Sequence, residues 1–129
     1  MVAEVLSGMV QGIQGELITV QADISDGLPV FGMTGHLSSE VKEAKERVRT
    51  ALKNTGYHLP PRRVSVNLAP ADVRKSGTCY DLAIAVGILT AMGLISRESV
   101  RGILFLGELS LDGMLSPLTG VLSILKAAL

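Results

Sequence analysis

The sequence predicts a two-layer α+β domain, in which helices pack on a mostly antiparallel sheet. Three observations lead to this prediction. Polar and apolar residues alternate over 16–24, which is typical of a strand with one packed face. Apolar residues recur at helical spacing over 40–55, and residues 82–95 are apolar on nearly every side. At 129 residues the chain has the length of one domain, 1–129, with its own core.

The amino-terminal part predicts three strands. Residues 2–10 are mostly apolar, and Gly8 within them indicates a bend or a bulge. The alternating segment 16–24 is the second strand. A cluster of turn residues at 25–29 then leads into a third strand at 30–34. We expect these three strands to form an antiparallel meander.

A helix is predicted from about residue 40 to residue 55. Ser38 or Ser39 can cap its start, and Gly56 can provide a left-handed exit. We interpret its basic outer face as a solvated surface balanced by glutamates. The basic residues of this face are Lys42, Lys45, Arg47, Arg49 and Lys53.

The stretch 63–93 organises the rest of the chain as a strand, a polar loop and a buried helix. Residues 63–68 alternate between polar and apolar, and Pro70 ends that strand. The helix over 82–95 has no polar stripe and is too short to span a membrane, so we expect it to be covered by protein on all sides.

The carboxyl-terminal part predicts a buried strand at 102–106, a hairpin at 108–116 around Asp112-Gly113, and a helix over 121–129. The last helix ends without a cap, which suggests that the chain is a fragment of a longer protein.

The composition excludes several classes of protein. Twelve basic and twelve acidic residues cancel, so the domain as a whole lacks the field of a dedicated nucleic-acid binder. A single cysteine excludes an internal disulfide, and with only two histidines a zinc site is disfavoured. No signal peptide or anchor is visible, and we expect a cytoplasmic protein. The mean hydropathy of +0.41 suggests burial against a neighbouring domain or subunit.

The loop 69–81 is the first place to look for chemistry, because it precedes a helix whose first amides could stabilise an anion or a thiolate. Cys79 is the candidate nucleophile, although no local residue supplies a base. The alternative is that Thr78 or Asp81 simply caps the helix. Residues 75–78 lack the order of a phosphate-binding loop. Basic pairs flank the strand, namely Arg62 and Arg63 before it and Arg74 and Lys75 after it.

Several long motifs carry a family resemblance. The segments are 66–75 (Val-Asn-Leu-Ala-Pro-Ala-Asp-Val-Arg-Lys), 80–85 (Tyr-Asp-Leu-Ala-Ile-Ala) and 106–113 (Leu-Gly-Glu-Leu-Ser-Leu-Asp-Gly), supported by 23–29 and 46–52. Together they resemble the amino-terminal domain of the magnesium-chelatase-like ComM/YifB family over nearly the whole chain. The sequence departs from the family pattern at 35–39 and at 78–79.

The resemblance implies a fold like that of the Lon protease domain and of the second domain of a ribosomal small-subunit protein. It also implies that this domain precedes an AAA+ ATPase module, which would bind ATP and Mg. Members of the family are associated with DNA processing in natural competence, as ring-shaped helicases on branched DNA. The implied partners are therefore its own AAA+ domain, the neighbouring subunits of a hexameric ring, and DNA through the full protein, with no membrane.

The Lon-like resemblance can be tested at the two positions of the Lon catalytic dyad. It places Cys79 at the nucleophile and Leu122 at the lysine, and a leucine cannot take a proton. Lys126 lies one helical turn further on. We therefore expect no catalytic, cofactor-binding or metal-binding residue in this domain.

These observations predict a non-catalytic accessory domain of a magnesium-chelatase-like AAA+ ATPase, which assists ring assembly or guides DNA. The predicted DNA or partner contacts are Arg62, Arg63, Arg74 and Lys75. One alternative is a cysteine-based peptidase or acyl-transfer domain that uses Cys79. Another is a free-standing protein-interaction domain.

Overall fold

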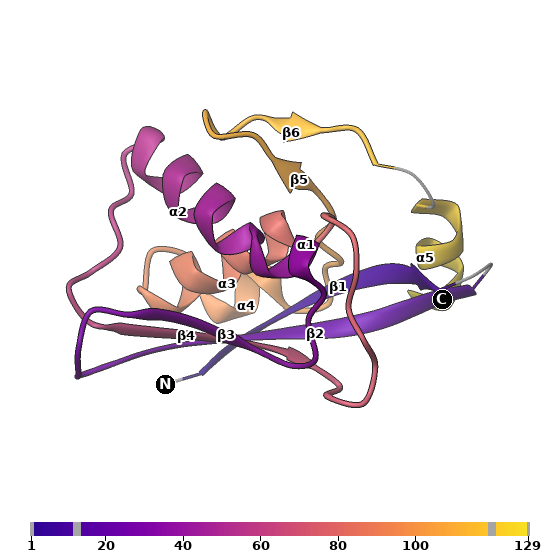
Figure 1. Cartoon of the computed structure of the whole chain (residues 1–129), viewed down its shortest axis with the longest axis horizontal. Helices are drawn as coiled ribbons and strands as arrows, with labels where there is room; N and C mark the ends of the chain where they lie inside the picture. Colours follow the sequence, from indigo (N-terminus) through magenta and orange to yellow (C-terminus); the bar gives the residue numbers. More distant parts are fainter. Residues whose placement is uncertain (1, 12–13, 119–120, 129) are drawn as a thin grey trace.

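A computed structural model of the chain describes residues 2–11, 14–118 and 121–128. Its main element is a four-stranded sheet with the strand order β1-β2-β4-β3, and helices cover one face of this sheet (Figure 1). The strands are β1 (Ala3–Gln11), β2 (Gln14–Ser25), β3 (Phe31–Thr34) and β4 (Arg63–Ala69). The predicted class, α+β with a mostly antiparallel sheet, is confirmed, and it is consistent with a Lon-like domain.

The first two strands form a long antiparallel ribbon. Their register runs unbroken from Ala3 opposite Ala22 to Met9 opposite Glu16. Of the bend or bulge predicted at Gly8, the bulge is therefore wrong. Gly8 instead lets a helix approach the ribbon, because an added Cβ there would lie 2.5 Å from the side chain of Ile124.

The third strand differs from the prediction. β3 pairs parallel with β4, with Phe31 opposite Val64 and Met33 opposite Val66, whereas β2 pairs antiparallel with β4. The meander that we predicted is therefore wrong. The connection between β3 and β4 contains two helices, and a crossover of this kind joins parallel strands rather than antiparallel ones.

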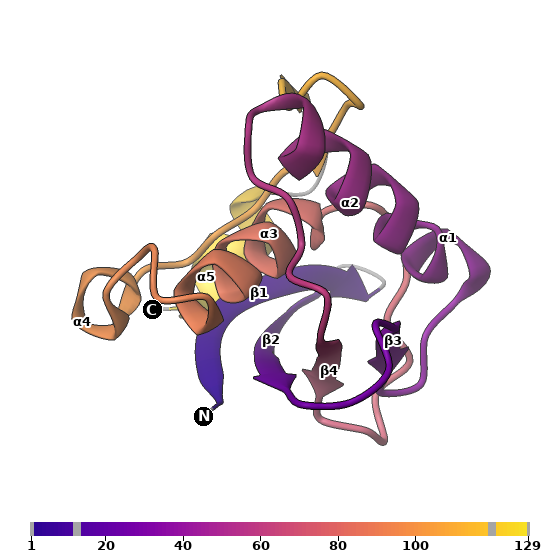
Figure 2. The ribbon, with the colours of Figure 1, turned by 90° about the vertical axis from the view of Figure 1, so that its left-hand side faces the viewer.

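Three helices in the middle of the chain form the second layer. The helix predicted over 40–55 is split into α1 (Ser39–Lys42) and α2 (Ala44–Asn54), and the core helix α3 runs over Asp81–Ala91. The Ser38 hydroxyl accepts from the Val41 amide at 3.3 Å, as expected of a cap, and Gly56 adopts a φ of 96°. Figure 2 shows α1 and α2 above the β3 side of the sheet and α3 above β1 and β2.

The core lies between the sheet and α3. Val20, Val66 and Leu68 have at most 1% of their surface exposed, as do Ile84 and Ile88 on the helix. Every residue of α3 from Ala83 to Ile88 is buried, as predicted. The helix ends at Ala91 and not at residue 95, however, and Leu94 beyond it is 57% exposed. No helix in the described part of the chain is long and apolar enough to cross a bilayer.

The carboxyl-terminal segments surround this core. The predicted strand at 102–106 is wrong, because only Leu104 forms a bridge, to Leu6 of β1. The hairpin is confirmed as β5 (Glu108–Leu109) and β6 (Leu115–Ser116). A short helix α4 (Arg97–Val100) contacts β1, and α5 (Val121–Ala128) contacts β1 and β2.

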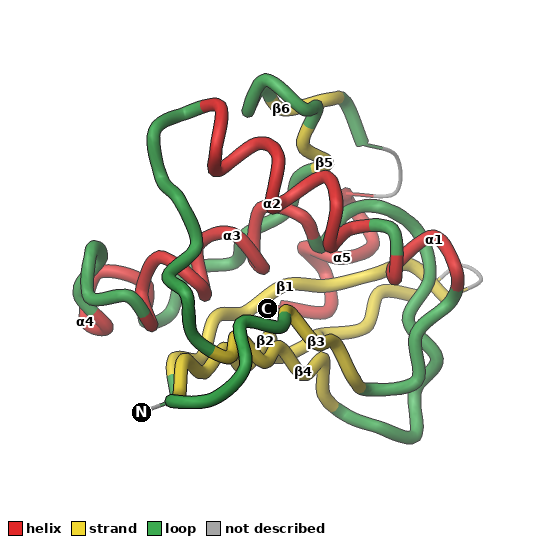
Figure 3. Tube along the Cα trace, turned by 60° about the vertical axis from the view of Figure 1, so that its left-hand side comes forward, coloured by secondary structure: helices red, strands yellow, loops and turns green. Residues whose placement is uncertain are grey.

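Figure 3 shows α1, α2 and α3 on one side of the sheet. The other face of the sheet carries a row of polar side chains. The Thr34 hydroxyl donates to Asn67 Oδ1 at 2.9 Å, and Asn67 Nδ2 donates to Gln21 Oε1 at 2.9 Å. Gln21 Nε2 then lies 3.3 Å from Glu4 Oε1. The row crosses all four strands of the sheet.

Candidate functional site

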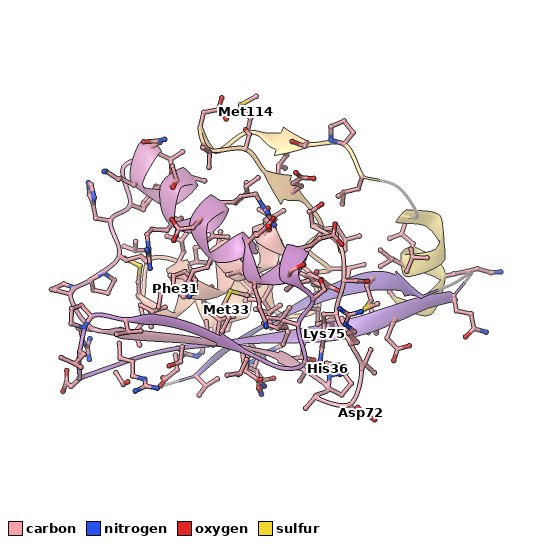
Figure 4. All side chains as sticks on the ribbon, viewed as in Figure 1. Phe31, Met33, His36, Asp72, Lys75 and Met114 are labelled. Atoms are coloured by element: carbon pink, nitrogen blue, oxygen red, sulfur yellow. The ribbon has the colours of Figure 1, made fainter. Side chains whose placement is uncertain are left out.

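The loop between β4 and α3 is fixed by the buried Lys75. Its ammonium donates to the Gly35 carbonyl at 2.6 Å and also to the Pro70 carbonyl. The Lys75 amide donates to His36 O, and Ser38 N donates to Lys75 O, so the loop pairs with the segment before α1. Figure 4 shows Lys75 beside His36, with Asp72 further out on the loop. Burial lowers the pKa of Lys75, and the charge of Asp72 partly offsets this effect.

This placement corrects one expected DNA contact. Lys75 has no exposed surface, and its ammonium binds two main-chain carbonyls, so it cannot reach a phosphate outside the domain. The other three predicted contacts, Arg62, Arg63 and Arg74, are exposed. They do not form one cluster, because Arg62 and Arg63 lie at the start of β4 and Arg74 lies in the loop after its other end.

Asp81 is the second buried charge of the region. Its carboxylate accepts from Arg47 Nε at 2.7 Å, from Arg47 Nη2 at 3.0 Å and from the Leu109 amide at 3.0 Å. Burial raises the pKa of Asp81, and the hydrogen bonds from Arg47 and Leu109 oppose that rise. The hydrogen bonds that Arg47 donates to Asp81 raise the pKa of Arg47. One carboxylate therefore joins α2, the start of α3 and β5.

The expectation that Thr78 or Asp81 caps α3 is wrong. Asp81 is the first residue of the helix, and the cap residue is Tyr80, which makes no capping hydrogen bond through its side chain. Thr78 Oγ1 instead donates to Glu108 Oε2 at 2.8 Å.

The segment 107–109 covers the start of α3. The Leu82 amide donates to Gly107 O at 3.0 Å, and the Gly107 amide donates to Cys79 O at 3.0 Å. An amide that already has a protein acceptor is not available to an anion. The Leu82 amide is therefore not available to the anion that we considered at this end of the helix.

Cys79 lies beside a cleft of about 340 Å³ that Thr78, Glu108 and Ile124 also line. Its Sγ lies 3.0 Å from the Gly8 carbonyl, to which the thiol donates. Burial raises the pKa of Cys79 to about 11. The thiol is therefore protonated near neutral pH, whereas a catalytic cysteine needs a lowered pKa.

Among the residues that the structure describes, no base is hydrogen-bonded to Cys79. His36 and His58 have exposed side chains, and the contact recorded for Sγ is the one to Gly8. Leu122 lies in α5, but its side chain falls outside the described residues. Lys126 is exposed, and the residue of α5 that lines the cleft is Ile124.

We expect Cys79 to react slowly with thiol reagents. With a pKa of about 11, only about one thiol in a thousand is ionised at pH 8, roughly two hundredfold fewer than for an unperturbed cysteine. Labelling with iodoacetamide, followed by mass spectrometry between pH 7 and pH 10, measures this directly. The rate should rise with pH throughout and increase sharply in 6 M urea. Rapid labelling of the folded chain at pH 7 would instead favour the cysteine enzyme.

Sequence reasoning missed the pair formed by Arg47 and Asp81. It assigned Arg47 to the solvated face of its helix. The signal was present, because Arg47 lies three residues after Ala44 and four before Ala51, which are both buried. Within the described residues, no group of three or more His, Cys, Asp or Glu side chains could hold a metal ion.

Comparison with known proteins gives the family. A family model described as subunit ChlI of Mg-chelatase matches residues 20–129. The competence protein ComM of Haemophilus influenzae is 40% identical over 126 residues, which cover 98% of this chain and 25% of that protein. The uncharacterised protein YifB of Salmonella typhimurium is 41% identical over 112 residues, which cover 87% of this chain and 22% of that protein.

A Lon protease of Mycolicibacterium smegmatis is 27% identical over 126 residues, 92% of this chain and 16% of that protein. The chain thus spans about a quarter or less of the length of these curated relatives. The match to the family model and the identity to ComM and YifB cover nearly all of the chain. The chain therefore belongs to the magnesium-chelatase subunit ChlI family, as a ComM/YifB-like member.

Proposed function

We propose that this chain is a non-catalytic accessory domain of a magnesium-chelatase-like AAA+ ATPase that processes DNA. In this proposal an ATPase module in the same protein binds ATP and Mg. The domain described here helps the subunits to assemble into a ring or guides DNA to it. Arg62, Arg63 and Arg74 are the exposed members of the set that we predicted for DNA or partner contacts.

The state of Cys79 is the observation that carries the non-catalytic part of the proposal. The position aligned with a Lon nucleophile holds a thiol that donates to the Gly8 carbonyl and has a pKa of about 11. Its neighbour Thr78 is bound to Glu108. A thiol in this state is a poor nucleophile near neutral pH.

The remaining parts rest on the relatives. Alignment with only about a quarter of each of these longer proteins, one of which is named a competence protein, supports a module within a larger protein. Exposed apolar side chains on the hairpin, Leu111, Met114 and Leu115, suit contact with a neighbouring domain or subunit.

Deleting this domain from the longer protein of its gene tests the role. We expect ATP hydrolysis by the remaining protein to persist, because the catalytic module is left intact. Ring assembly or unwinding of branched DNA should fall by about tenfold or more, the usual scale of coupling between sites. Mass photometry and a strand-displacement assay measure the two quantities.

A Cys79→Ala variant of the full protein serves as the control for that deletion, and it should retain both activities. If the deletion left assembly and unwinding unchanged, the accessory role would be wrong. If Cys79→Ala abolished a peptidase or acyl-transfer activity of a folded protein, the cysteine enzyme would replace it.

A further inference from the structure

We propose that a basic ridge on α2, together with the groove beside it, binds single-stranded nucleic acid. The ridge consists of Lys45, Arg49 and Lys53, and Arg62 lines the groove together with Arg49. This inference rests on the proposed function only in expecting that DNA is present. The location of this surface depends only on the charges and the geometry of the chain.

The charges of this chain are distributed very unevenly. Residues 42–63 contain seven of the twelve basic residues and two of the twelve acidic ones. Of these seven, Arg47 is taken up by the buried Asp81. Of the other six, five are exposed and Lys45 is half-buried, so a neutral protein carries a positive region at α2 and the start of β4.

The ridge is linear and regularly spaced. Lys45, Arg49 and Lys53 follow one another at intervals of four residues within α2, which places them on one side of the helix. The rise of an α-helix sets them about 6 Å apart along the axis. Lys45 and Lys53 make no ion pair with any residue that the structure describes.

A groove of about 330 Å³ lies beside the ridge. Arg49 and Arg62 both line it, together with the apolar Val30, Leu59 and Pro60. Arg49 is held over the ring of Phe31, with its guanidinium carbon 5.8 Å from the ring centre. Val30 is 54% exposed, so the groove offers apolar surface to an occupant.

The ion pairs of the two arginines in the groove are weak surface pairs. Arg49 contacts Glu46 at 3.3 Å, and Arg62 contacts Asp26 at 3.2 Å. Both carboxylates are well exposed, and exposed pairs of this kind contribute little free energy. A phosphate can therefore replace the carboxylate at either guanidinium with little loss.

Single-stranded nucleic acid fits this combination better than an acidic peptide does. Evenly spaced phosphates match the cations of the ridge, and an unpaired base presents a flat apolar face that suits the groove. A polyglutamate chain supplies the charge but no apolar group for the groove. Duplex DNA keeps its bases stacked inside the helix, where they cannot enter it.

The test is a binding assay on the 129-residue chain by fluorescence anisotropy. The probes are a labelled oligothymidine, the matching duplex and labelled polyglutamate, at several salt concentrations. We expect the oligothymidine to bind most tightly. Its logarithmic salt slope should be near −3, for about four phosphate contacts at roughly 0.7 each.

Two sets of variants locate the site. Reversing the ridge by Lys45→Glu, Arg49→Glu and Lys53→Glu should weaken binding about tenfold or more and flatten the salt slope by about 2. Removing the competing carboxylates by Glu46→Gln and Asp26→Asn should tighten binding by about two- to fivefold. The second set guards against misfolding, because a gain in affinity cannot come from an unfolded chain.

A matched control carries the same change in net charge on other surfaces. It combines Arg97→Glu, Arg101→Glu and Lys126→Glu, whose side chains lie on or next to α4 and α5, and α4 lies on the β1 side of the sheet, away from α2 (Figure 2). We expect it to lose much less affinity than the ridge variant.

Three outcomes would overturn this inference. They are no binding by the unchanged chain, equal losses in the ridge variant and the control, or equal binding of duplex or polyglutamate. None of them decides the accessory role, because the domain deletion tests ring assembly and unwinding separately.

Discussion

Replacing Asp81 with alanine is expected to lower the free energy of unfolding by about 3–5 kcal/mol. The Asp81 carboxylate is fully buried and accepts three hydrogen bonds, two of them from Arg47 and one from the Leu109 amide. Without it, a guanidinium whose side chain is 18% exposed loses its main partner. The start of α3 also loses its tie to β5. Urea denaturation followed by circular dichroism measures the change.

The exposed partner of the same arginine provides the control. Glu43 lies 4.0 Å from Arg47, but its side chain is 73% exposed. We expect Glu43→Gln to change stability by less than about 0.5 kcal/mol. A double-mutant cycle with Arg47→Ala should give a coupling energy of about 2 kcal/mol between Arg47 and Asp81. A loss below about 1 kcal/mol in Asp81→Ala would show that the buried pair does not hold the layers together.

Gly35→Ala is expected to lower the free energy of unfolding by about 4 kcal/mol or more. Two effects add at this position. Gly35 has a φ of 115°, which an alanine rarely adopts, and an added Cβ would lie 2.2 Å from the Leu68 carbonyl oxygen. A main-chain oxygen of the central strand cannot move aside cheaply. The yield of soluble protein and the urea midpoint report the effect.

Gly56→Ala separates the two causes. Gly56 also has a positive φ, of 96°, but nothing lies within 4 Å of an added Cβ. The Gly56→Ala variant should therefore lose only about 1–2 kcal/mol of stability, because only the backbone conformation is unfavourable. If both variants lost the same stability, the close approach between Gly35 and Leu68 would have no energetic role.

Much of the fold could be predicted from the sequence, because local pattern carried the information. The alternation in β2 and β4, the apolar helix α3 and the turn at Asp112-Gly113 each follow from neighbouring residues. The pairing of β3 could not be predicted in this way. A four-residue strand can have the same residue pattern whether it pairs parallel or antiparallel. The direction of pairing depends on where the crossover helices pack.

The candidate site was less predictable, because its key contacts join distant residues. Lys75 was interpreted as a surface cation, yet its ammonium is held by carbonyls at positions 35 and 70. Asp81 was interpreted as a helix cap, yet it binds an arginine 34 residues earlier. The local sequence is compatible with a solvated cation at Lys75 and a helix cap at Asp81. Only the tertiary fold shows which partner each side chain binds. The position of Cys79 in its loop was identified correctly, but its pKa depends on burial that the sequence does not display.

The row of side chains on the open face has a consequence for how the strands align. Moving one strand of a sheet by a single residue turns every side chain to the opposite face. Such a shift in β2 would bring Gln21 toward the helices and Val20 to the solvent, and it would break the bonds that join Gln21 to Asn67 and Glu4. The polar row therefore opposes misaligned pairing on the solvent face of the sheet, and the core opposes it on the other face. The row consists of Thr34, Asn67, Gln21 and Glu4.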